Sequence, residues 1–102
     1  TEVSYAEELG CELVKIFPAG QVGGPEFVAS VKGPMPWSDI MPSGGVTPEY
    51  DNLKAWFKAG AACVGMGSQL IKKSYLTENN YAGLSEKIKE TLAVIKKIRS
   101  EL

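Results

Sequence analysis

The chain has 102 residues, of which 44% are hydrophobic and 23% charged, and its 11 basic and 12 acidic side chains give a net charge of -1. This length suits one soluble domain and leaves no room for a second. A nearly neutral chain without a lysine and arginine cluster lacks the basic face that nucleic acid or an anionic membrane surface requires, so neither is an expected partner.

Location and redox setting follow from simple patterns. The first residues lack the charged-then-apolar order of a signal peptide, and no apolar run approaches the length of a membrane span. We therefore expect a cytoplasmic protein. Because the chain has no histidine, a metal site built from Cys and His is excluded. Cys11 and Cys63 lie in apolar, strand-like segments and are expected to be buried thiols rather than a disulfide.

The first half of the chain has two strand patterns and two helix patterns. The chain opens on the last turns, residues 5–9, of a helix that starts at or before residue 1. Residues 11–17 are apolar on nearly both faces, which is typical of parallel strands that helices cover. Pro25 at a first helical position and Gly33 as the stop predict a helix between them. A second, short strand is predicted at residues 38–41.

The second half repeats this order. Thr47 is the predicted N-cap of a helix that Gly60 closes. Residues 61–66 are the third predicted strand, followed by a short helix over residues 67–71. Residues 81–99 place their apolar side chains on one stripe, which is typical of a helix docked on a core. Three strand-loop-helix units in series predict an α/β protein with a right-handed parallel sheet, either doubly wound or part of a barrel.

Lys15 stands in the middle of the first strand pattern. Strand alternation places it on the face of Leu13 and Phe17, opposite Glu12. A lysine in a strand covered on both faces carries a desolvation cost unless it reaches a partner or a cavity. Burial favours the neutral amine, which attacks carbonyl carbons, so one interpretation is a nucleophile. The alternative is a lysine that reaches solvent or pairs with a carboxylate on a neighbouring strand.

Two glycine-rich turns follow the second and third predicted strands. Glycines let the main chain approach a ligand, and the amide groups of a turn that opens a helix favour an anion. Two such turns on adjacent strands form the phosphate site of many barrels. The alternative is that each glycine only permits a tight turn. The turns are Ser43-Gly44-Gly45 and Gly65-Met66-Gly67-Ser68.

An ordered set of short motifs runs along the chain. The motifs are KIFPA at 15–19, GGP at 23–25, KGP at 32–34, PSGGV at 42–46, AGA at 59–61 and VGMGS at 64–68. In order and spacing they resemble the C-terminal half of the 2-keto-3-deoxy-6-phosphogluconate / 4-hydroxy-2-oxoglutarate aldolases. The resemblance covers essentially the whole chain.

This resemblance implies a class I aldolase on a (β/α)8 TIM barrel, usually a homotrimer, with no metal or organic cofactor. It implies that Lys15 is the Schiff-base lysine at the end of barrel strand 6, with Phe17 and Pro18 lining the pocket beside it. Ser43 falls where the family commonly has Thr or Ser, near the carboxylate end of the substrate. The phosphate-binding residues that the resemblance implies are Gly44, Gly45, Gly67 and Ser68.

The implied substrate is a small 2-oxo acid. The family cleaves 2-keto-3-deoxy-6-phosphogluconate to pyruvate and glyceraldehyde 3-phosphate, or 4-hydroxy-2-oxoglutarate to pyruvate and glyoxylate. Only the first substrate needs a phosphate site, so the presence of both glycine turns favours the phosphorylated sugar acid. Two alternatives remain: another phosphate-binding barrel enzyme that does not need Lys15, and a non-catalytic unit that only binds an anion.

Length argues that residues 1–102 are a single partial barrel. A complete barrel typically takes about 250 residues and rarely fewer than about 200, whereas this chain matches strands 6 to 8. The family's general acid/base glutamate and a carboxylate-binding arginine come from the other half and have no counterpart here. We expect a truncated or proteolysed fragment, inactive alone, whose open face is covered by another copy or by the other half of the barrel.

Overall fold

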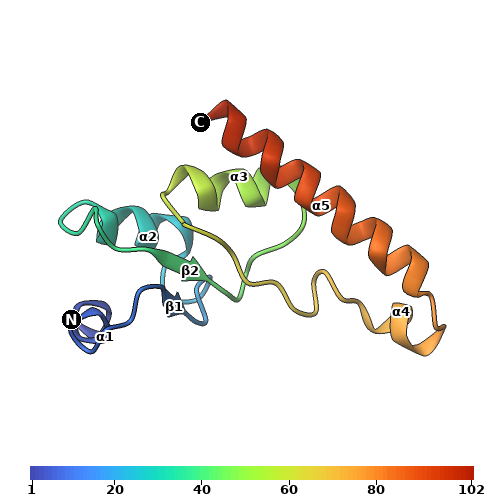
Figure 1. Ribbon diagram of the computed structural model, residues 1–102, viewed down its shortest axis with the longest axis horizontal. Coiled ribbons are helices and arrows are strands. Elements are labelled where there is room, and N and C mark those ends of the chain that lie inside the picture. The colour runs from blue at the N-terminus through green and yellow to red at the C-terminus, as the bar shows by residue number, and fades with distance from the viewer.

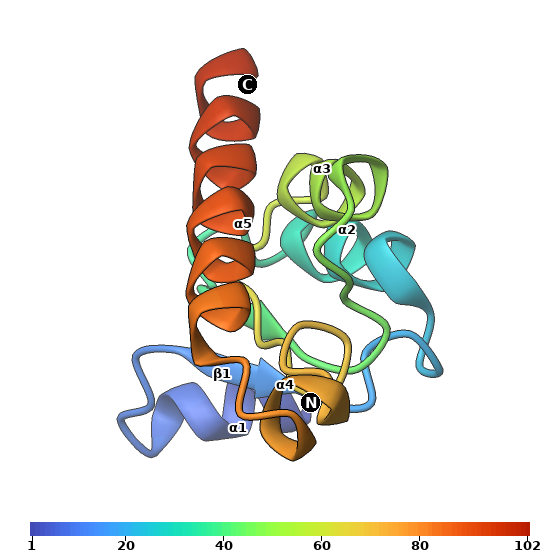
Figure 2. The same ribbon diagram turned by 90° about the vertical axis from the view of Figure 1, so that its right-hand side faces the viewer.

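A layer of helices lies over two short parallel strands in the computed structural model, which describes all 102 residues (Figure 1). Helices α2, α3 and α5 lie on one side of the strands, whereas α1 and α4 lie toward opposite ends of the long axis (Figures 1 and 2). The predicted α/β class is therefore confirmed. In chain order the elements are α1 (Glu2–Glu8), β1 (Val14–Ile16), α2 (Gly24–Lys32), β2 (Ile40–Pro42), α3 (Tyr50–Lys58), α4 (Lys73–Thr77) and α5 (Tyr81–Glu101).

The core fills the space between the strands and the helices. Apolar residues of α3 at helical spacing, Leu53, Trp56 and Phe57, are buried against Ile40 of β2. Ile98 brings α5 into the same cluster. Burying one such side chain contributes about 1.5–3 kcal/mol, so this cluster supplies the main stabilisation of the fold. Its eight buried members are Ala19, Val28, Ile40, Val46, Leu53, Trp56, Phe57 and Ile98.

The third predicted strand, residues 61–66, is absent, and this prediction is wrong. The segment does run beside β2: the Ala62 amide donates to the Ile40 carbonyl and the Gly65 amide to the Pro42 carbonyl, both at 2.9 Å. Between the two donors stand Cys63 and Val64, whereas Met41 alone stands between the two acceptors, and two residues against one is the count of a bulge. Only an isolated parallel bridge, at Gly65, continues the ladder.

Both remaining strands are short, and the two cysteines are free thiols as predicted but are not buried. The sheet has two strands, and β1 begins three residues later than the strand pattern at residues 11–17. Cys11 is exposed and its thiol donates to the Leu13 carbonyl, while Cys63 is half-buried, and both are free. No strand pairs with the outer edge of β1, so the residues that precede it are not held in the sheet.

The helix predicted to begin after Thr47 begins two residues late. Its first residue is Tyr50, with Glu49 as N-cap. The Asn52 side chain explains the shift, because it accepts from the Thr47 amide at 2.8 Å and donates to the Gly45 carbonyl at 3.1 Å. These two bonds hold the preceding loop against the first turn and take up the Thr47 amide outside the helix.

The short helix predicted over residues 67–71 is a single turn. Its two bonds run from the amides of Leu70 and Ile71 to the Gly67 carbonyl. Ile71 is exposed, so the turn lacks the packed apolar face that extends a helix. The sequence did not predict α4, whereas α5 ends two residues beyond the predicted helix. None of the helices combines the length and hydrophobicity needed to cross a lipid bilayer.

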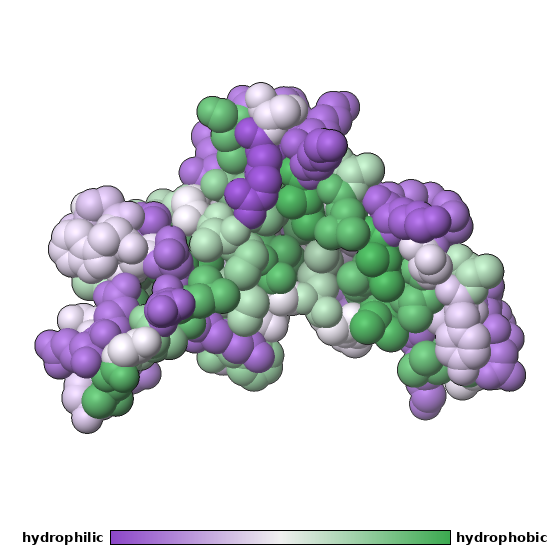
Figure 3. Space-filling view, in the orientation of Figure 1, coloured by the Kyte–Doolittle hydropathy of each residue, from purple (hydrophilic) through white to green (hydrophobic).

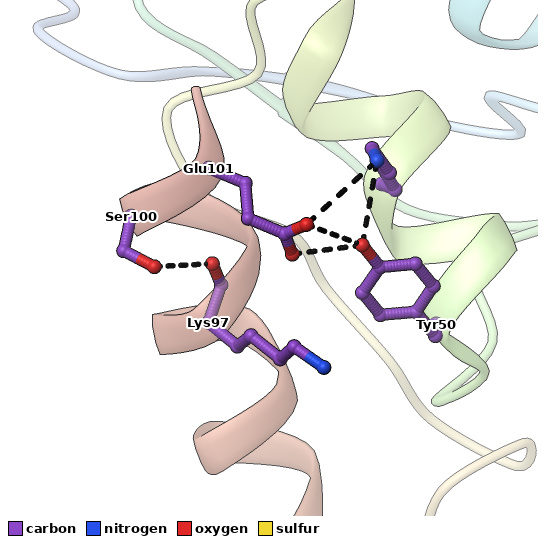
Figure 4. Close-up of polar contacts among 5 residues, drawn as sticks. Tyr50, Lys97, Ser100 and Glu101 are labelled. Carbon is purple, nitrogen blue, oxygen red and sulfur yellow. Dashed lines mark hydrogen bonds and ion pairs between the residues drawn. The ribbon is translucent and has the colours of Figure 1, made fainter.

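A polar contact ties α5 to α3 at the C-terminus (Figure 4). The Tyr50 hydroxyl donates to the Glu101 carboxylate, 2.7 and 2.9 Å from its two oxygens, and Lys54 donates to the same hydroxyl at 3.3 Å. The pKa of Lys54 is raised above its ordinary 10.5, first by the hydrogen bond to Tyr50 and the electrostatic interaction with it, then by the negative charge of Glu101. Lys97 lies over the Tyr50 ring, 5.6 Å from its centroid.

Substituting Tyr50→Phe is expected to return the pKa of Lys54 toward 10.5, because the hydroxyl that accepts the hydrogen bond of the Lys54 ammonium group is lost. A raised lysine pKa stabilises the fold below the ordinary value and stops doing so as pH rises through the raised value. The α3–α5 contact should therefore weaken at a lower pH in the variant. Carbon-13 NMR of the lysine side chains measures the pKa directly, and an unchanged Lys54 titration would contradict this assignment.

Candidate active site

Lys15 projects from the middle of β1 on the face that the helices leave open. Its strand partners are in register, with Lys15 opposite Met41. The neighbouring Val14 is buried toward the helices, whereas Lys15 is exposed. The predicted alternation of faces is therefore confirmed, but the predicted burial on both faces is wrong. The reason is that α1 and α2 form only the walls of an open pocket around Lys15, and no strand pairs with the outer edge of β1.

Phe17 shares the face of Lys15. The Lys15 Nζ atom lies 5.8 Å from the centroid of the Phe17 ring, and that ring is 69% exposed. Both residues line a pocket of about 690 Å³ along the outer side of β1. Its other walls come from α1, α2 and the loops that join them to their neighbours, and include Glu2, Val22 and Phe27.

The loop that follows β1 packs closely on the first glycine turn. Two amides of this loop, those of Ala19 and Gly20, donate to the carbonyls of Ser43 and Gly44 at 2.8 and 2.9 Å. In the opposite direction, the Ser43 amide donates to the Ile16 carbonyl at 2.9 Å. This ladder fixes the ends of β1 and β2 side by side, so the residues after both strands face a common space.

The contact between these loops requires glycine at two positions. Gly44 and Gly45 have φ angles of +89° and +84°, a region that side chains disfavour. A Cβ on Gly44 would lie 3.2 Å from the Pro18 Cα, and a Cβ on Gly45 would lie 3.1 Å from the Gly20 Cα. The glycines therefore serve both turn geometry and close backbone approach.

The second glycine turn lies beside the first. Gly65 bridges to Ser43, and a Cβ on Gly65 would stand 3.1 Å from the Ser43 Oγ atom. The chain then turns through Gly67 and Ser68, both exposed. Gly67 has open space around its Cα, so its role is not steric.

The two turns and Phe17 enclose one pocket of about 290 Å³. Six of the residues proposed from the sequence meet there, while Lys15 lines the neighbouring larger pocket and Pro18 lines neither. Phe17 is the wall that the two pockets share. The lining residues are Phe17, Ser43, Gly44, Gly45, Val46, Gly65, Gly67, Ser68 and Gln69.

The pocket is rich in free hydrogen-bond donors. Six of its backbone amides donate to no other group of the chain, in two runs of three: residues 44–46 and residues 67–69. Consecutive free amides in a turn form a concavity that suits an anion. The Ser68 hydroxyl adds a donor at the same place. Neither a carboxylate nor a lysine lines this pocket.

Val46 and Gln69 were not predicted as site residues. Each directly follows a glycine turn, so its amide belongs to one of the two runs, and adjacency in the chain was the signal that would have found them. Pro18 lines neither pocket but packs behind the first glycine turn. Its Cα lies against Gly44, and its carbonyl accepts from the Val22 amide at 3.2 Å. No group of carboxylate or thiol side chains in the structure is arranged to hold a metal ion.

The structure is thus an α/β unit whose parallel strands end in glycine turns around a pocket of free amides. The family model "KDPG and KHG aldolase" matches residues 1–87. The chain belongs to the KDPG and KHG aldolase family.

Relatives agree with this assignment. The chain is 41% identical over 80 residues to the 2-dehydro-3-deoxy-6-phosphogalactonate aldolase of Escherichia coli K12, covering 76% of this chain and 37% of that protein. It is 28% identical over 94 residues to the 2-dehydro-3-deoxy-phosphogluconate aldolase of Haemophilus influenzae, covering 92% and 43%. A solved structure described as native KDPGal matches with a TM-score of 0.70 at 29% identity, over 98% of this chain and 44% of that one. The chain thus spans about two fifths of the length of these relatives.

Proposed function

We propose that this chain is the nucleophile-bearing and phosphate-binding part of a class I aldolase. The observation that carries the proposal is the placement of Lys15 next to Phe17, whose ring separates the lysine from the pocket of free amides. A substrate with a carbonyl at one end and a phosphate at the other spans two such neighbouring sites. Family membership supports the same reaction.

The chemistry follows from what an amine does to a 2-oxo acid. The neutral Lys15 amine attacks the C2 carbonyl, and loss of water leaves a protonated imine. The imine draws electrons from the C3–C4 bond, which breaks to leave an enamine of pyruvate while the C4 hydroxyl gives up its proton and becomes an aldehyde. Protonation of the enamine and addition of water then release pyruvate and restore the amine.

The phosphate end of the substrate is proposed to bind in the glycine pocket. Two runs of amides and the Ser68 hydroxyl supply donors without a balancing positive side chain, which suits a site that orients an anion through hydrogen bonds. The matched relatives are named for two phosphorylated sugar acids. The substrate class is therefore a 2-keto-3-deoxy-6-phospho sugar acid that yields pyruvate and glyceraldehyde 3-phosphate, in preference to 4-hydroxy-2-oxoglutarate.

The proposed setting is a (β/α)8 barrel in which this chain forms one partial unit, with β1 and β2 as successive strands. The complete protein is proposed to be a cytoplasmic homo-oligomer, a trimer as the resemblance implies, that needs no metal or organic cofactor. Coverage of the lysine face by further strands would supply the burial that this chain alone does not give Lys15.

In one alternative function, the glycine pocket binds an anion but the chain takes no part in catalysis. The unit would then bind an anion only, which the exposure of Lys15 favours. Phosphate titration followed by heteronuclear NMR tests the pocket itself. Shifts of the Gly44, Gly45 and Ser68 amides support an anion site, and unshifted amides would contradict both functions.

The chain assayed alone is expected to show little or no aldolase turnover. General acid/base catalysis typically contributes 10²–10⁴-fold, and the pocket around Lys15 holds only Glu2 as a carboxylate, with no ion pair or hydrogen bond to the lysine. A coupled assay for pyruvate release measures this. Robust turnover that disappears in Lys15→Ala would show that a group of this chain replaces the missing acid/base.

A further inference from the structure

The hydrogen bonds between β1 and β2 follow the regular pattern of a parallel ladder. The Val14 amide donates to the carbonyl of Asp39, the residue before its strand partner Ile40. The Ile16 carbonyl accepts from the amide of Ser43, the residue after its own strand partner. A residue that faces the neighbouring strand thus directs its amide to the residue before its partner and its carbonyl to the residue after it.

This pattern fails on the other side of β2, at Ala62. The Ala62 amide donates to the Ile40 carbonyl at 2.9 Å, so the pattern assigns the Ala62 carbonyl to the amide of residue 42. Residue 42 is Pro42, which has no backbone N–H. The ladder therefore lacks one donor where residues 61–66 run beside β2. The bulge follows directly, and a proline inside a sheet is typically found at such a bulge.

Arg99 of α5 provides a donor for this carbonyl. It lies in the last turn of the helix, where hydrophilic side chains gather above hydrophobic surface in the space-filling view (Figure 3). Its Nη2 atom donates to the Ala62 carbonyl, and its Cζ atom lies 4.7 Å from the centroid of the buried Phe57 ring. A planar guanidinium can stack on a ring and donate at its edge at the same time. Arg99 thus takes the place of the missing main-chain donor.

The segment at residues 61–66 leads directly into the second glycine turn. Two hydrogen bonds tie it to β2, those from the amides of Ala62 and Gly65, and the bulge separates them. The Arg99 bond is a third fixed point, because a carbonyl left without a partner is unfavourable and would favour another path of the bulge. The free amides of residues 67–69 begin two residues beyond Gly65. Their position therefore depends on how this segment is held.

We propose that Arg99 is a positioning residue for the glycine pocket: it replaces the donor that Pro42 lacks and so holds the second glycine turn against the first. The first run of free amides, residues 44–46, follows β2 and is held by the loop after β1 instead, through the amides of Ala19 and Gly20. Loss of the Arg99 bond should therefore move the second run and leave the first. The proposal rests on the proposed function only for the identity of the ligand, a phosphate group.

Arg99→Met tests the positioning role, because methionine keeps most of the stem over Phe57 and removes every donor. In heteronuclear NMR of the full 102-residue chain, we expect the amide signals of residues 67–69 to shift and those of residues 44–46 to stay. The Gly65 amide should exchange with solvent at least about tenfold faster, as expected for loss of a hydrogen bond from a charged donor. Equal changes in both runs, or an unchanged Gly65 exchange rate, would overturn the proposal.

Lys96→Met is the matched control. Lys96 is exposed on the same helix, and the substitution removes the same positive charge without removing a bond to the sheet. It should change neither the amide signals nor the exchange rate. An effect as large as that of Arg99→Met would mean that the charge of α5 acts, and not the bond to Ala62.

Pro42→Ala tests whether Arg99 replaces a missing donor. Alanine restores an N–H at residue 42, which the ladder pattern directs to the Ala62 carbonyl. In this background, Arg99→Met should accelerate Gly65 exchange by less than about threefold, since two groups that serve one acceptor are not additive. The same acceleration with and without Pro42→Ala would contradict the replacement.

Titration with inorganic phosphate connects the bond to the pocket. The Kd of phosphate should rise at least about threefold in Arg99→Met and stay unchanged in Lys96→Met. The outcome is separable from that of the proposed function. Shifted amides at residues 67–69 and faster Gly65 exchange in a chain that binds no phosphate would support the role of Arg99 and contradict the phosphate site. Phosphate binding that Arg99→Met does not weaken would do the reverse.

Discussion

Replacing Lys15 with arginine is expected to abolish aldolase activity, by roughly 10⁴-fold or more, as for other lost nucleophiles. Arginine keeps the positive charge but is effectively always protonated, so it has no lone pair with which to form an imine. The measurement is kcat/KM for pyruvate release in a chimera in which this chain replaces the matched segment of the Escherichia coli relative.

A second lysine provides the control for this substitution. Lys58 is exposed at the end of α3, away from the lysine pocket, and Lys58→Arg should leave kcat/KM unchanged. Loss of a catalytic nucleophile lowers activity by several orders of magnitude. If the Lys15→Arg chimera retained more than about a tenth of the activity of the unsubstituted chimera, Lys15 would only position the substrate.

Substituting Gly45→Ala is expected to destabilise the protein by about 2 kcal/mol, because a left-handed backbone costs about 1–2 kcal/mol for a residue with a Cβ. The new Cβ would also stand 3.1 Å from the Gly20 Cα, and a backbone atom cannot move aside as a side chain does. Opening this contact displaces the amides of residues 44–46, so phosphate binding should weaken at least about tenfold. Urea unfolding and phosphate titration of the chimera measure the two effects.

Gly67→Ala is the matched control for Gly45→Ala, because it adds the same methyl group to a glycine of the same pocket that has no close backbone contact. Gly67 lines the same pocket, but a Cβ at this position would have no heavy atom within 4 Å, and its φ is not positive. The unfolding free energy should therefore change by less than about 0.5 kcal/mol. Equal destabilisation by both substitutions would show that the close approach of Gly45 to Gly20 does not hold the turn.

The helices could be predicted because their signals are local. A glycine before Pro25 and another after Lys32 place α2 as observed, and the apolar spacing of Leu53, Trp56 and Phe57 gives the buried face of α3. The start of α3 was misplaced because the Asn52 side chain bonds back to the loop, a contact that depends on how that loop folds.

The strands were harder to predict because pairing decides them. Residues 61–66 have a strand composition, but the extra residue between the amides of Ala62 and Gly65 breaks the ladder. The same limit applies to Lys15. Its face was predicted correctly from alternation, whereas its burial depended on neighbouring strands that this chain does not contain.

The glycine pocket was the most predictable part of the site. Glycines at the ends of neighbouring strands must lie together once the strands are parallel, and the structure brings both turns into one pocket. The relation of Lys15 to that pocket was not accessible from spacing, because it depends on the Phe17 ring that lies between them.

The most direct test of the account is mass spectrometry after incubation with pyruvate and sodium borohydride, performed on the chimera in which this chain replaces the matched segment of the Escherichia coli relative. The account predicts a stable adduct that peptide mapping places on Lys15. Absence of any adduct in the chimera, or an adduct on another lysine, would contradict the assignment of Lys15 as the Schiff-base nucleophile.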